Sequence, residues 1–209
     1  MVPDYSLYIC TDTKLAGERG NLAAVKLALE GGATVVQLRE KEMSTRELIA
    51  LGAAIQELCR DHGALFIVND RVDVALALDA DGVHVGQDDM SCVDARRLVG
   101  PGKIVGVSAT TLPEALRAAR DGADYLGVGP IYYTGTKPDA APATGIALVE
   151  AAKRETGLPI VAIGGISAPN AAAIVAAGAD GVAVISAVLA APNPRVAAAE
   201  LREIILGAR

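Results

Sequence analysis

Eight short apolar runs, rich in valine and isoleucine, recur along the chain. Each run is almost unbroken in its hydrophobicity, which is typical of parallel strands that are covered on both faces. Segments rich in alanine, leucine, glutamate and arginine alternate with the runs, as at 22–30, 45–61 and 112–120, and these favour helices. The expected strands span 7–11, 34–38, 65–68, 82–85, 104–107, 124–128, 160–163 and 181–185.

Two of the expected helices carry recognisable start signals. Ser44 and Glu47 have the spacing of a capping box, in which each side chain binds a backbone amide of the first turn. Pro113 suits the first turn of a helix that follows Thr111, because that position needs no amide proton. The signals therefore predict helix starts close to residues 45 and 112.

A short pattern is repeated before every second expected strand, at 30–34, 80–83, 121–124 and 177–180. Each copy places a glycine near the end of a helix, where a left-handed cap is needed, and a strand then follows. The copies precede the second, fourth, sixth and eighth expected strands. The pattern thus indicates strand–helix units arranged in pairs.

The number of units predicts the fold class. Eight strand–helix units in 209 residues average about 26 residues each, close to the lower limit for an α/β protein of the (β/α)₈, or TIM-barrel, type. A doubly wound open sheet is the competing architecture, but it would need fewer units and a G-x-G-x-x-G turn after its first strand. The chain has Thr11-Asp12-Thr13-Lys14 at that point, and no linker divides it. We expect one TIM-barrel domain over residues 1–209.

Composition and charge exclude several classes of partner. Lys and Arg total 19 against 25 for Asp and Glu, which gives a net charge of −6, and aromatic residues make up 3%. An acidic chain without a basic run is a poor ligand for nucleic acid or an anionic membrane. The most apolar stretch, 174–191, contains Asp180 and is not a bilayer span, and the N-terminus lacks the basic residues of a signal peptide. We expect neither a nucleic-acid nor a membrane partner.

The cysteines indicate the compartment. Cys10, Cys59 and Cys92 are odd in number and widely separated, and they form no C-x-x-C motif. With only His62 and His84 beside them, a zinc site is not expected, and reduced thiols in a cytoplasmic enzyme are the favoured interpretation.

Polar and charged residues gather after the expected strands. Because a barrel interior is expected to be a packed apolar plug, its chemistry should lie on the loops at the carboxyl ends of the strands. The opposite ends offer mostly glycine and alanine. The residues that follow the strands are Asp12; Gln37, Arg39, Glu40 and Lys41; Asn69, Asp70 and Arg71; Gln87, Asp88 and Asp89; Ser108; Thr134, Thr136 and Lys137; Gly164 and Gly165; and Ser186.

Two carboxylates on neighbouring strands suggest a magnesium site. Asp70 follows the third expected strand and Asp89 the fourth, and oxygen ligands without a convergent His or Cys suit Mg²⁺. Arg39 and Lys41 alternate at the end of the second strand and could clamp a doubly charged anion that the metal also holds. Two alternatives remain open here: Asp70, Asp88 and Asp89 could be helix N-caps, and the four charges could form a plain salt-bridge cluster.

The later strands predict a phosphate site. Gly164 and Gly165 follow the seventh expected strand, where backbone amides at a helix N-terminus commonly hold phosphate in barrels. The longest connection, 129–144, favours a lid or binding loop, with a solvated turn as the alternative. His84, inside an expected strand, is interpreted as a hydrogen-bonded packing residue, and Cys10 and Cys92 have no paired base that would make a thiol nucleophile.

Six groups of motifs, taken in order, resemble the thiamine-phosphate synthase family over nearly the whole chain. They are Gln37-Leu38-Arg39-Glu40-Lys41; Val68-Asn69-Asp70; His84-Val85-Gly86-Gln87-Asp88-Asp89 with Gly106-Val107-Ser108; Gly129-Pro130-Ile131-Tyr132 with Thr134-Gly135-Thr136-Lys137; Ile163-Gly164-Gly165-Ile166; and Ile185-Ser186.

The resemblance implies a transferase of thiamine biosynthesis. Such an enzyme joins 4-amino-5-hydroxymethyl-2-methylpyrimidine diphosphate to 4-methyl-5-(2-phosphoethyl)thiazole, with Mg²⁺ as cofactor, and releases thiamine phosphate and pyrophosphate. In the mechanism it implies, Mg²⁺ assists a dissociative loss of pyrophosphate. These small molecules are the expected partners, and a homo-oligomer is compatible with the family.

The resemblance also assigns residues, motif by motif. The pyrimidine diphosphate would be held by Gln37, Leu38, Arg39, Glu40, Lys41, Asn69, Ser108 and Lys137, of which Arg39, Lys41, Ser108 and Lys137 would be catalytic. Mg²⁺ would be held by Asp70 and Asp89, while Asp88 matches a position that only tends to be acidic. The thiazole phosphate would be held by Thr134, Gly135, Thr136, Gly165, Ile185 and Ser186.

One departure from the family pattern is visible, and three other functions compete. Tyr133 stands where the family commonly has proline before the first loop threonine, which loosens a rigid turn. A thiazole tautomerase-like relative would share the barrel but tends to lack the diphosphate and metal residues. A Schiff-base aldolase would use Lys41 or Lys137. A non-catalytic barrel that senses a phosphate ligand would release no pyrophosphate.

Overall fold

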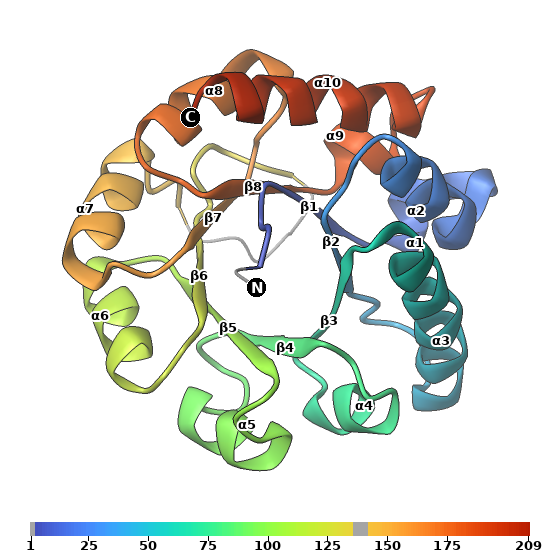
Figure 1. The fold of residues 1–209 in the computed structure, drawn as a ribbon, viewed down its shortest axis with the longest axis horizontal. Helices are drawn as coiled ribbons and strands as arrows, with labels where there is room; N and C mark the ends of the chain where they lie inside the picture. The colour runs from blue at the N-terminus through green and yellow to red at the C-terminus, as the bar shows by residue number, and fades with distance from the viewer. Residues whose placement is uncertain (1–2, 136–141) are drawn as a thin grey trace.

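Eight parallel strands close into a barrel in the order β1 to β8, with each strand paired to the next and β8 paired to β1. The computed structural model describes residues 3–135 and 142–209. Figure 1 shows the strands around the centre of the molecule and the helices outside them. The strands are β1 (Leu7–Cys10), β2 (Val35–Leu38), β3 (Leu65–Asn69), β4 (Gly82–Val85), β5 (Ile104–Ala109), β6 (Tyr125–Val128), β7 (Ile160–Ile163) and β8 (Gly181–Val184).

The helices begin where the sequence signals predict. Ser44 caps the second long helix with Glu47, and Thr111 caps a later one with Glu114 while Pro113 sits in its first turn. None of the helices within the described residues is long and apolar enough to cross a membrane. The helical segments are α1 (Thr13–Ala16), η1 (Gly17–Arg19), α2 (Gly20–Glu30), α3 (Thr45–His62), α4 (Val72–Ala77), α5 (Cys92–Val99), α6 (Leu112–Arg120), α7 (Ile146–Thr156), α8 (Ala168–Ala176), α9 (Ser186–Leu189) and α10 (Pro194–Gly207).

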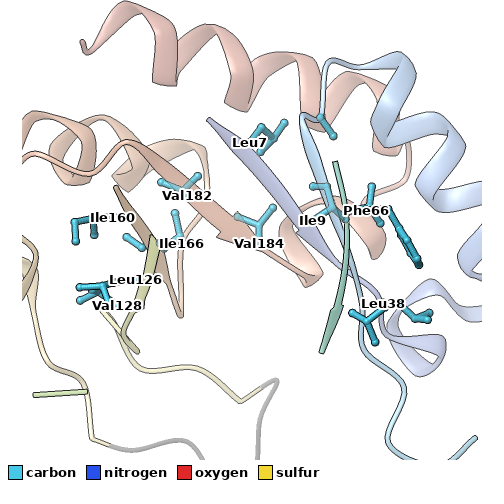
Figure 2. Packing of buried hydrophobic residues seen from close by; sticks show 14 of the residues in the cluster. Leu7, Ile9, Leu38, Phe66, Leu126, Val128, Ile160, Ile166, Val182 and Val184 are labelled. Carbon is cyan, nitrogen blue, oxygen red and sulfur yellow. The ribbon is translucent and has the colours of Figure 1, made fainter. Parts of the chain in front are cut away.

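Alternate residues of each strand face the two sides of the barrel wall. The outward residues, among them Ile9, Phe66 and Val182, are fully buried and form a continuous core against the helices (Figure 2). Both faces of the strands are therefore covered, which explains why the runs read as continuous apolar segments. The fold class and all eight strands that the sequence predicts are confirmed.

The inside of the barrel differs from the apolar plug that we expected. Tyr8, Tyr125 and His84 point inward and are almost completely buried, and Tyr8 and Tyr125 belong to a smaller inner cluster. Glycines make room for the rings: a Cβ on Gly106 would lie 2.2 Å from Tyr125 Cζ, and one on Gly127 would lie 2.8 Å from His84 Cε1. Polar aromatic side chains thus occupy space that small residues on neighbouring strands leave open.

The repeated pattern before every second strand forms clamps at the amino ends of the barrel strands. Asp81 donates its backbone amide to the Phe66 carbonyl, and its carboxylate accepts the Phe66 amide at 2.8 Å. Asp124 makes the same pair of bonds with Val105, and Asp180 makes it with Ile160. Thr34 replaces aspartate in the first copy and bonds Leu7. Each clamp satisfies an amide at a strand start and ties an odd-numbered strand to the next one.

The expected glycine caps are correct in three copies and wrong in one. Gly32, Gly122 and Gly178 have positive φ angles of 97°, 88° and 101°. In the second copy the left-handed residue is Asp79, with φ 50°, whereas Gly82 lies inside β4. A Cβ on Gly82 would lie 2.3 Å from the Ile104 carbonyl oxygen, so close approach of two strands explains the glycine there.

Removing one of these clamps should lower the stability of the fold without changing the carboxyl ends of the strands. Asp124→Ala leaves the Val105 amide without its acceptor at 2.7 Å and removes the ion pair with Arg96. We expect the free energy of unfolding in urea to fall by about 1–3 kcal/mol. Asp124→Asn keeps an acceptor for the Val105 amide, and its free energy of unfolding should fall clearly less than that of Asp124→Ala. Equal losses in the two variants would show that the ion pair, and not the strand clamp, carries the effect.

Candidate active site

A cavity of about 750 Å³ opens at the carboxyl ends of the strands. Its wall comes from residues of β1 to β8 and from the loops that follow them, as the barrel geometry requires. The structure brings most of the predicted site residues together here. Those that line the cavity are Gln37, Arg39, Asn69, Ser108, Thr134, Gly135, Gly165, Ile185 and Ser186.

Two predicted residues turn their side chains away from the cavity. Leu38 is 1% exposed and packs outward in the core between barrel and helices (Figure 2). Glu40 accepts bonds from Thr13 and from the Asn21 amide, and so ties the end of β2 to the segment after β1. Leu38 alternates with Gln37 in β2 and therefore faces the helices, whereas Glu40 lies two residues beyond the strand with its carboxylate bonded to Thr13 and Asn21. Thr136 and Lys137 lie outside the described residues.

Asp70 and Asp89 meet on the rim. Their carboxyl groups lie within hydrogen-bonding reach, and burial together with the nearby Asp89 charge raises the pKa of Asp70 to about 6, against the opposing effects of Asn69 and Lys41. Asp70 has a left-handed backbone with φ 59°, an unusual conformation for a residue other than glycine. The Asp89 charge thus disfavours ionisation of Asp70, and a cation beside the two carboxylates would offset this effect.

The alternative that these aspartates are helix caps is wrong. The residue at the start of α4 is Arg71, which makes no capping bond with its side chain, and the cap of α5 is Ser91. Asp89 instead accepts the Gly86 amide at 2.8 Å within its own loop. Asp88 lines the cavity next to this loop.

The donor set fits magnesium. No group of three or more His, Cys, Asp or Glu side chains suited to a metal occurs in the parts of the chain that the structure describes. Mg²⁺ commonly takes one or two carboxylates and completes its octahedron with water and substrate phosphate oxygens. Asp70 and Asp89 supply two such ligands beside an open cavity.

Positive charge lies beside this pair of carboxylates. Arg39 lines the cavity, and its backbone amide is held by the Thr11 hydroxyl at 2.8 Å. Within residues 3–135 and 142–209, its guanidinium makes no ion pair with a carboxylate, so the alternative of a plain salt-bridge cluster does not hold for Arg39. Lys41 is close enough to lower the pKa of Asp70. The Arg39 guanidinium, which no carboxylate of the described residues neutralises, is suited to an anionic ligand.

The opposite half of the mouth is formed after β6, β7 and β8. Gly164 and Gly165 have φ angles of 100° and 66° and lead into α8. A Cβ on Gly165 would lie 2.7 Å from the Tyr133 carbonyl oxygen, because the loop after β6 packs directly against this turn. The backbone turn and the N-terminus of α8, where Ser167 also lines the cavity, favour an anion.

The start of the long loop after β6 is anchored to this glycine turn. The Ile131 amide donates to the Ile163 carbonyl at 2.9 Å, and the Tyr132 amide donates to the Gly164 carbonyl at 3.1 Å. Tyr133 is 89% exposed, yet it lines the cavity together with Thr134. The described part of the loop therefore forms a wall of the cavity.

A chain of hydrogen-bonded side chains, absent from our sequence-based site, forms the floor. Tyr8 and Tyr125 share a hydroxyl–hydroxyl bond of 2.8 Å, and the Tyr125 hydroxyl also bonds His84 Nδ1 at 2.8 Å. The hydrogen-bonded interpretation of His84 is thus confirmed, and burial lowers the pKa of its ring to about 4. Inward alternation along the strands was the signal that could have identified Tyr8 and Tyr125, since both occupy inward positions of predicted strands.

The cysteines do not supply a nucleophile. All three are buried and free, and burial raises the pKa of the Cys10 thiol, which lines the cavity, to about 12. A thiol in this state is neutral and unreactive as a nucleophile.

Comparison with known proteins shows similarity over nearly the whole chain. The model of a family described as "Thiamine monophosphate synthase" matches residues 7–188. A protein of Moorella thermoacetica named "Thiamine-phosphate synthase" is 55% identical over 208 residues, covering 100% of this chain and 99% of the relative. One of the same name from Chloroflexus aurantiacus is 55% identical, covering 98% and 94%. A solved structure of thiamine phosphate pyrophosphorylase from Pyrococcus furiosus has a TM-score of 0.91 at 43% identity, covering 99% and 98%.

The buried imidazole predicts a pH-dependent stability. His84 has a pKa of about 4 in the folded chain and an ordinary value of 6.5, so between these values the unfolded chain binds a proton that the folded chain does not. The contribution is fully present above about pH 6.5, and the free energy of unfolding falls as the pH falls. We expect the His84 contribution to fall by about 2 kcal/mol between roughly pH 7 and pH 5, measured by urea unfolding as the difference between the wild-type protein and His84→Gln, because Asp70, whose raised pKa acts in the opposite direction, titrates in both proteins. His84→Gln has no titrating ring and should lose correspondingly less. If the free energies of unfolding of the two proteins changed equally with pH, the interpretation of His84 as a buried neutral ring would be contradicted.

Proposed function

The chain is a member of the thiamine monophosphate synthase family, and from this premise we propose that it condenses 4-amino-5-hydroxymethyl-2-methylpyrimidine diphosphate with 4-methyl-5-(2-phosphoethyl)thiazole. The products are thiamine phosphate and pyrophosphate, which makes the protein a transferase of thiamine biosynthesis. The proposed substrates carry a diphosphate and a phosphate respectively, so the site has to hold two anions at once.

The observation that carries the proposal is that two groups of residues, each with features that favour an anion or its metal, lie around one cavity mouth. Arg39 and the Asp70–Asp89 pair follow β2, β3 and β4, whereas Gly165 and Ser186 follow β7 and β8. Figure 1 shows these two sets of strands on opposite sides of the barrel. A reaction between two phosphorylated heterocycles needs this arrangement, because their reacting atoms must meet between two separately held anions.

The diphosphate belongs at the β2–β4 half. Arg39 and Lys41 supply positive charge there, and Asn69 and Ser108 supply neutral hydrogen bonds. The family resemblance assigns Lys137, which lies outside the described residues, to the same diphosphate. Gln37 would contact the pyrimidine, and Leu38 and Glu40 would contribute through the main chain, because their side chains are engaged elsewhere. Asp70 and Asp89 would hold Mg²⁺, which neutralises negative charge on the diphosphate oxygens when it is bound.

The thiazole phosphate belongs at the other half. Gly165 and Ser186 lie at the starts of α8 and α9, and Thr134, Gly135 and Thr136 provide donors from the loop after β6. Ile185 would pack against the heterocycle beside its phosphate. We place the phosphate near the N-terminus of α8, whose amides and dipole favour negative charge.

The proposed reaction forms no covalent bond between substrate and protein. The bond between the pyrimidine methylene carbon and the diphosphate oxygen breaks, and its electron pair leaves with pyrophosphate. The ring nitrogen of the thiazole then donates its lone pair to the methylene cation and forms the new carbon–nitrogen bond. No protein nucleophile is needed, in agreement with the neutral Cys10 thiol. Arg39, Lys41, Ser108 and Lys137 would stabilise charge growing on the leaving group.

Pyrophosphate release from the two substrates tests the function and the metal together. The wild-type protein should release pyrophosphate only when both substrates and Mg²⁺ are present. Asp70→Asn removes one of the paired charges and should raise the Mg²⁺ concentration needed for half-maximal activity by about 10-fold or more. Asp88→Asn, one residue from Asp89 but outside the pair, is the matched control and should keep the wild-type requirement. Activity that resists both a chelator and Asp70→Asn would exclude the metal assignment.

Lys137→Ala tests the stabilisation of the leaving group. We expect kcat to fall on the order of 10²–10³-fold, because the lost cation acts mainly on charge that develops during bond breaking. Lys103→Ala removes a lysine near the amino end of β5, where its ammonium pairs with Asp79, and should leave kcat unchanged. A raised KM at constant kcat in Lys137→Ala would show that the lysine binds substrate uniformly and does not favour the transition state.

A further inference from the structure

A continuous series of hydrogen bonds crosses the barrel interior beneath the cavity. Gln37 Nε2 donates to the Tyr8 hydroxyl at 2.9 Å, and this hydroxyl bonds that of Tyr125 at 2.8 Å. Tyr125 bonds His84 Nδ1 at 2.8 Å, and His84 Nε2 bonds the Ser108 hydroxyl at 2.9 Å. The series therefore links two residues proposed to bind the pyrimidine diphosphate, Gln37 and Ser108, through three side chains with no role so far.

The number of protons that each side chain carries determines which group donates in each hydrogen bond of the series. Because Tyr8 accepts a proton from the Gln37 amide, its own hydroxyl proton is available to Tyr125. Tyr125 then donates its proton to His84 Nδ1, which must be the unprotonated nitrogen. A neutral imidazole carries its one proton on the other nitrogen, so His84 Nε2 donates to the Ser108 oxygen. The Ser108 proton is left to point into the cavity.

The end of the series at Gln37 supports the same direction. The Cys10 thiol donates to Gln37 Oε1, with 3.5 Å between sulfur and oxygen. This contact makes the oxygen the acceptor toward Cys10 and leaves the amide protons of Gln37 to face Tyr8. If the Gln37 amide were rotated by 180°, donor and acceptor would exchange in every hydrogen bond of the series, and the Ser108 hydroxyl would donate to His84 instead of to a ligand.

The rings have little freedom to depart from this arrangement. Tyr8 and Tyr125 are each 1% exposed, and His84 is 8% exposed. The space beside Tyr125 is limited by Gly106, and the space beside His84 by Gly127, where even a Cβ would come too close. The donors are consequently oriented before any ligand binds, which is the condition under which a hydrogen bond contributes most to catalysis.

We propose that Tyr8, Tyr125 and His84 are positioning residues that hold His84 as the Nε2–H tautomer, so that Ser108 presents its hydroxyl proton to an oxygen of the pyrimidine diphosphate. This role rests on the proposed function. Apolar side chains could fill the barrel interior without needing hydrogen-bond partners. The positioning role explains why polar side chains occupy this space instead.

The tautomer can be measured without any activity. Nitrogen-15 NMR of the intact protein labelled at histidine should show a proton on His84 Nε2 and none on Nδ1. The chain has two histidines, and His62→Gln assigns their signals. His62 provides an internal contrast, because its Nδ1 lies 2.8 Å from the Leu58 carbonyl and must carry the proton there. A proton on His84 Nδ1 would overturn the proposal.

The kinetic test uses two amides that imitate different nitrogens of the ring. His84→Gln places its amide nitrogen near the position of Nε2 and can still donate to Ser108, whereas His84→Asn imitates Nδ1 and cannot. We expect kcat/KM for the pyrimidine diphosphate to fall about 10- to 100-fold in His84→Asn and to be largely restored in His84→Gln. The KM for the thiazole phosphate should stay the same in both, a separation that general loosening of the fold would not produce.

A double-mutant cycle shows whether the effect passes through Ser108. In a Ser108→Ala background, His84→Asn should cause little additional loss, because the group it orients has gone. Full additivity, or equal activity of His84→Asn and His84→Gln, would overturn the proposal. If the wild-type protein released no pyrophosphate, the proposed function would fail, while the His84 tautomer in the NMR spectrum would still support or refute the hydrogen-bond direction.

Discussion

Closure of the parallel sheet is the constraint on which the site depends. In a closed barrel of parallel strands, every carboxyl end lies on the same rim, however far apart the residues are in the chain. Arg39, Asp88 and Ser186 follow three different strands, and closure alone brings them to one cavity of about 750 Å³. An open sheet with the same sequence of units would separate its first and last strands, so the loops after β2 to β4 would not share a cavity with those after β7 and β8.

The interior adds a second constraint, because a polar group inside a barrel has to be satisfied there. Tyr8, Tyr125 and His84 satisfy one another through bonds of 2.8 Å, and the series reaches the cavity at Gln37 and Ser108. Burying a hydroxyl or imidazole without a partner costs several times what a single hydrogen bond contributes. The glycines at 106 and 127 are therefore as much part of the site as the polar residues, since any side chain there would displace a ring from the series.

The parts of the molecule that were predictable from sequence are those governed by local rules. Strand positions follow from continuous hydrophobicity, the start of α3 follows from the Ser44 capping box, and the carboxylate pair follows from strand order. The motif assigns Leu38 and Glu40 to the site, but Leu38 alternates with Gln37 in β2 and packs in the outer core, and the Glu40 carboxylate bonds Thr13. Other features depend on contacts between segments that are distant in the sequence. Gly82, for example, is required by the close Ile104 carbonyl of the next strand, which no local pattern reveals.

The two ends of the barrel divide stability and function between them. At the amino ends, Asp81, Asp124 and Asp180 each satisfy a strand amide and hold paired strands together. At the carboxyl ends, Asp70 has a left-handed backbone and faces Asp89, so both its conformation and the ionisation of its carboxyl group are unfavourable. Unfavourable terms of this kind persist only where the surrounding structure is stable enough to impose them. Aspartates thus stabilise the amino end of the barrel by satisfying strand amides, whereas at the carboxyl end the Asp70–Asp89 pair is a strained arrangement that the rest of the fold maintains.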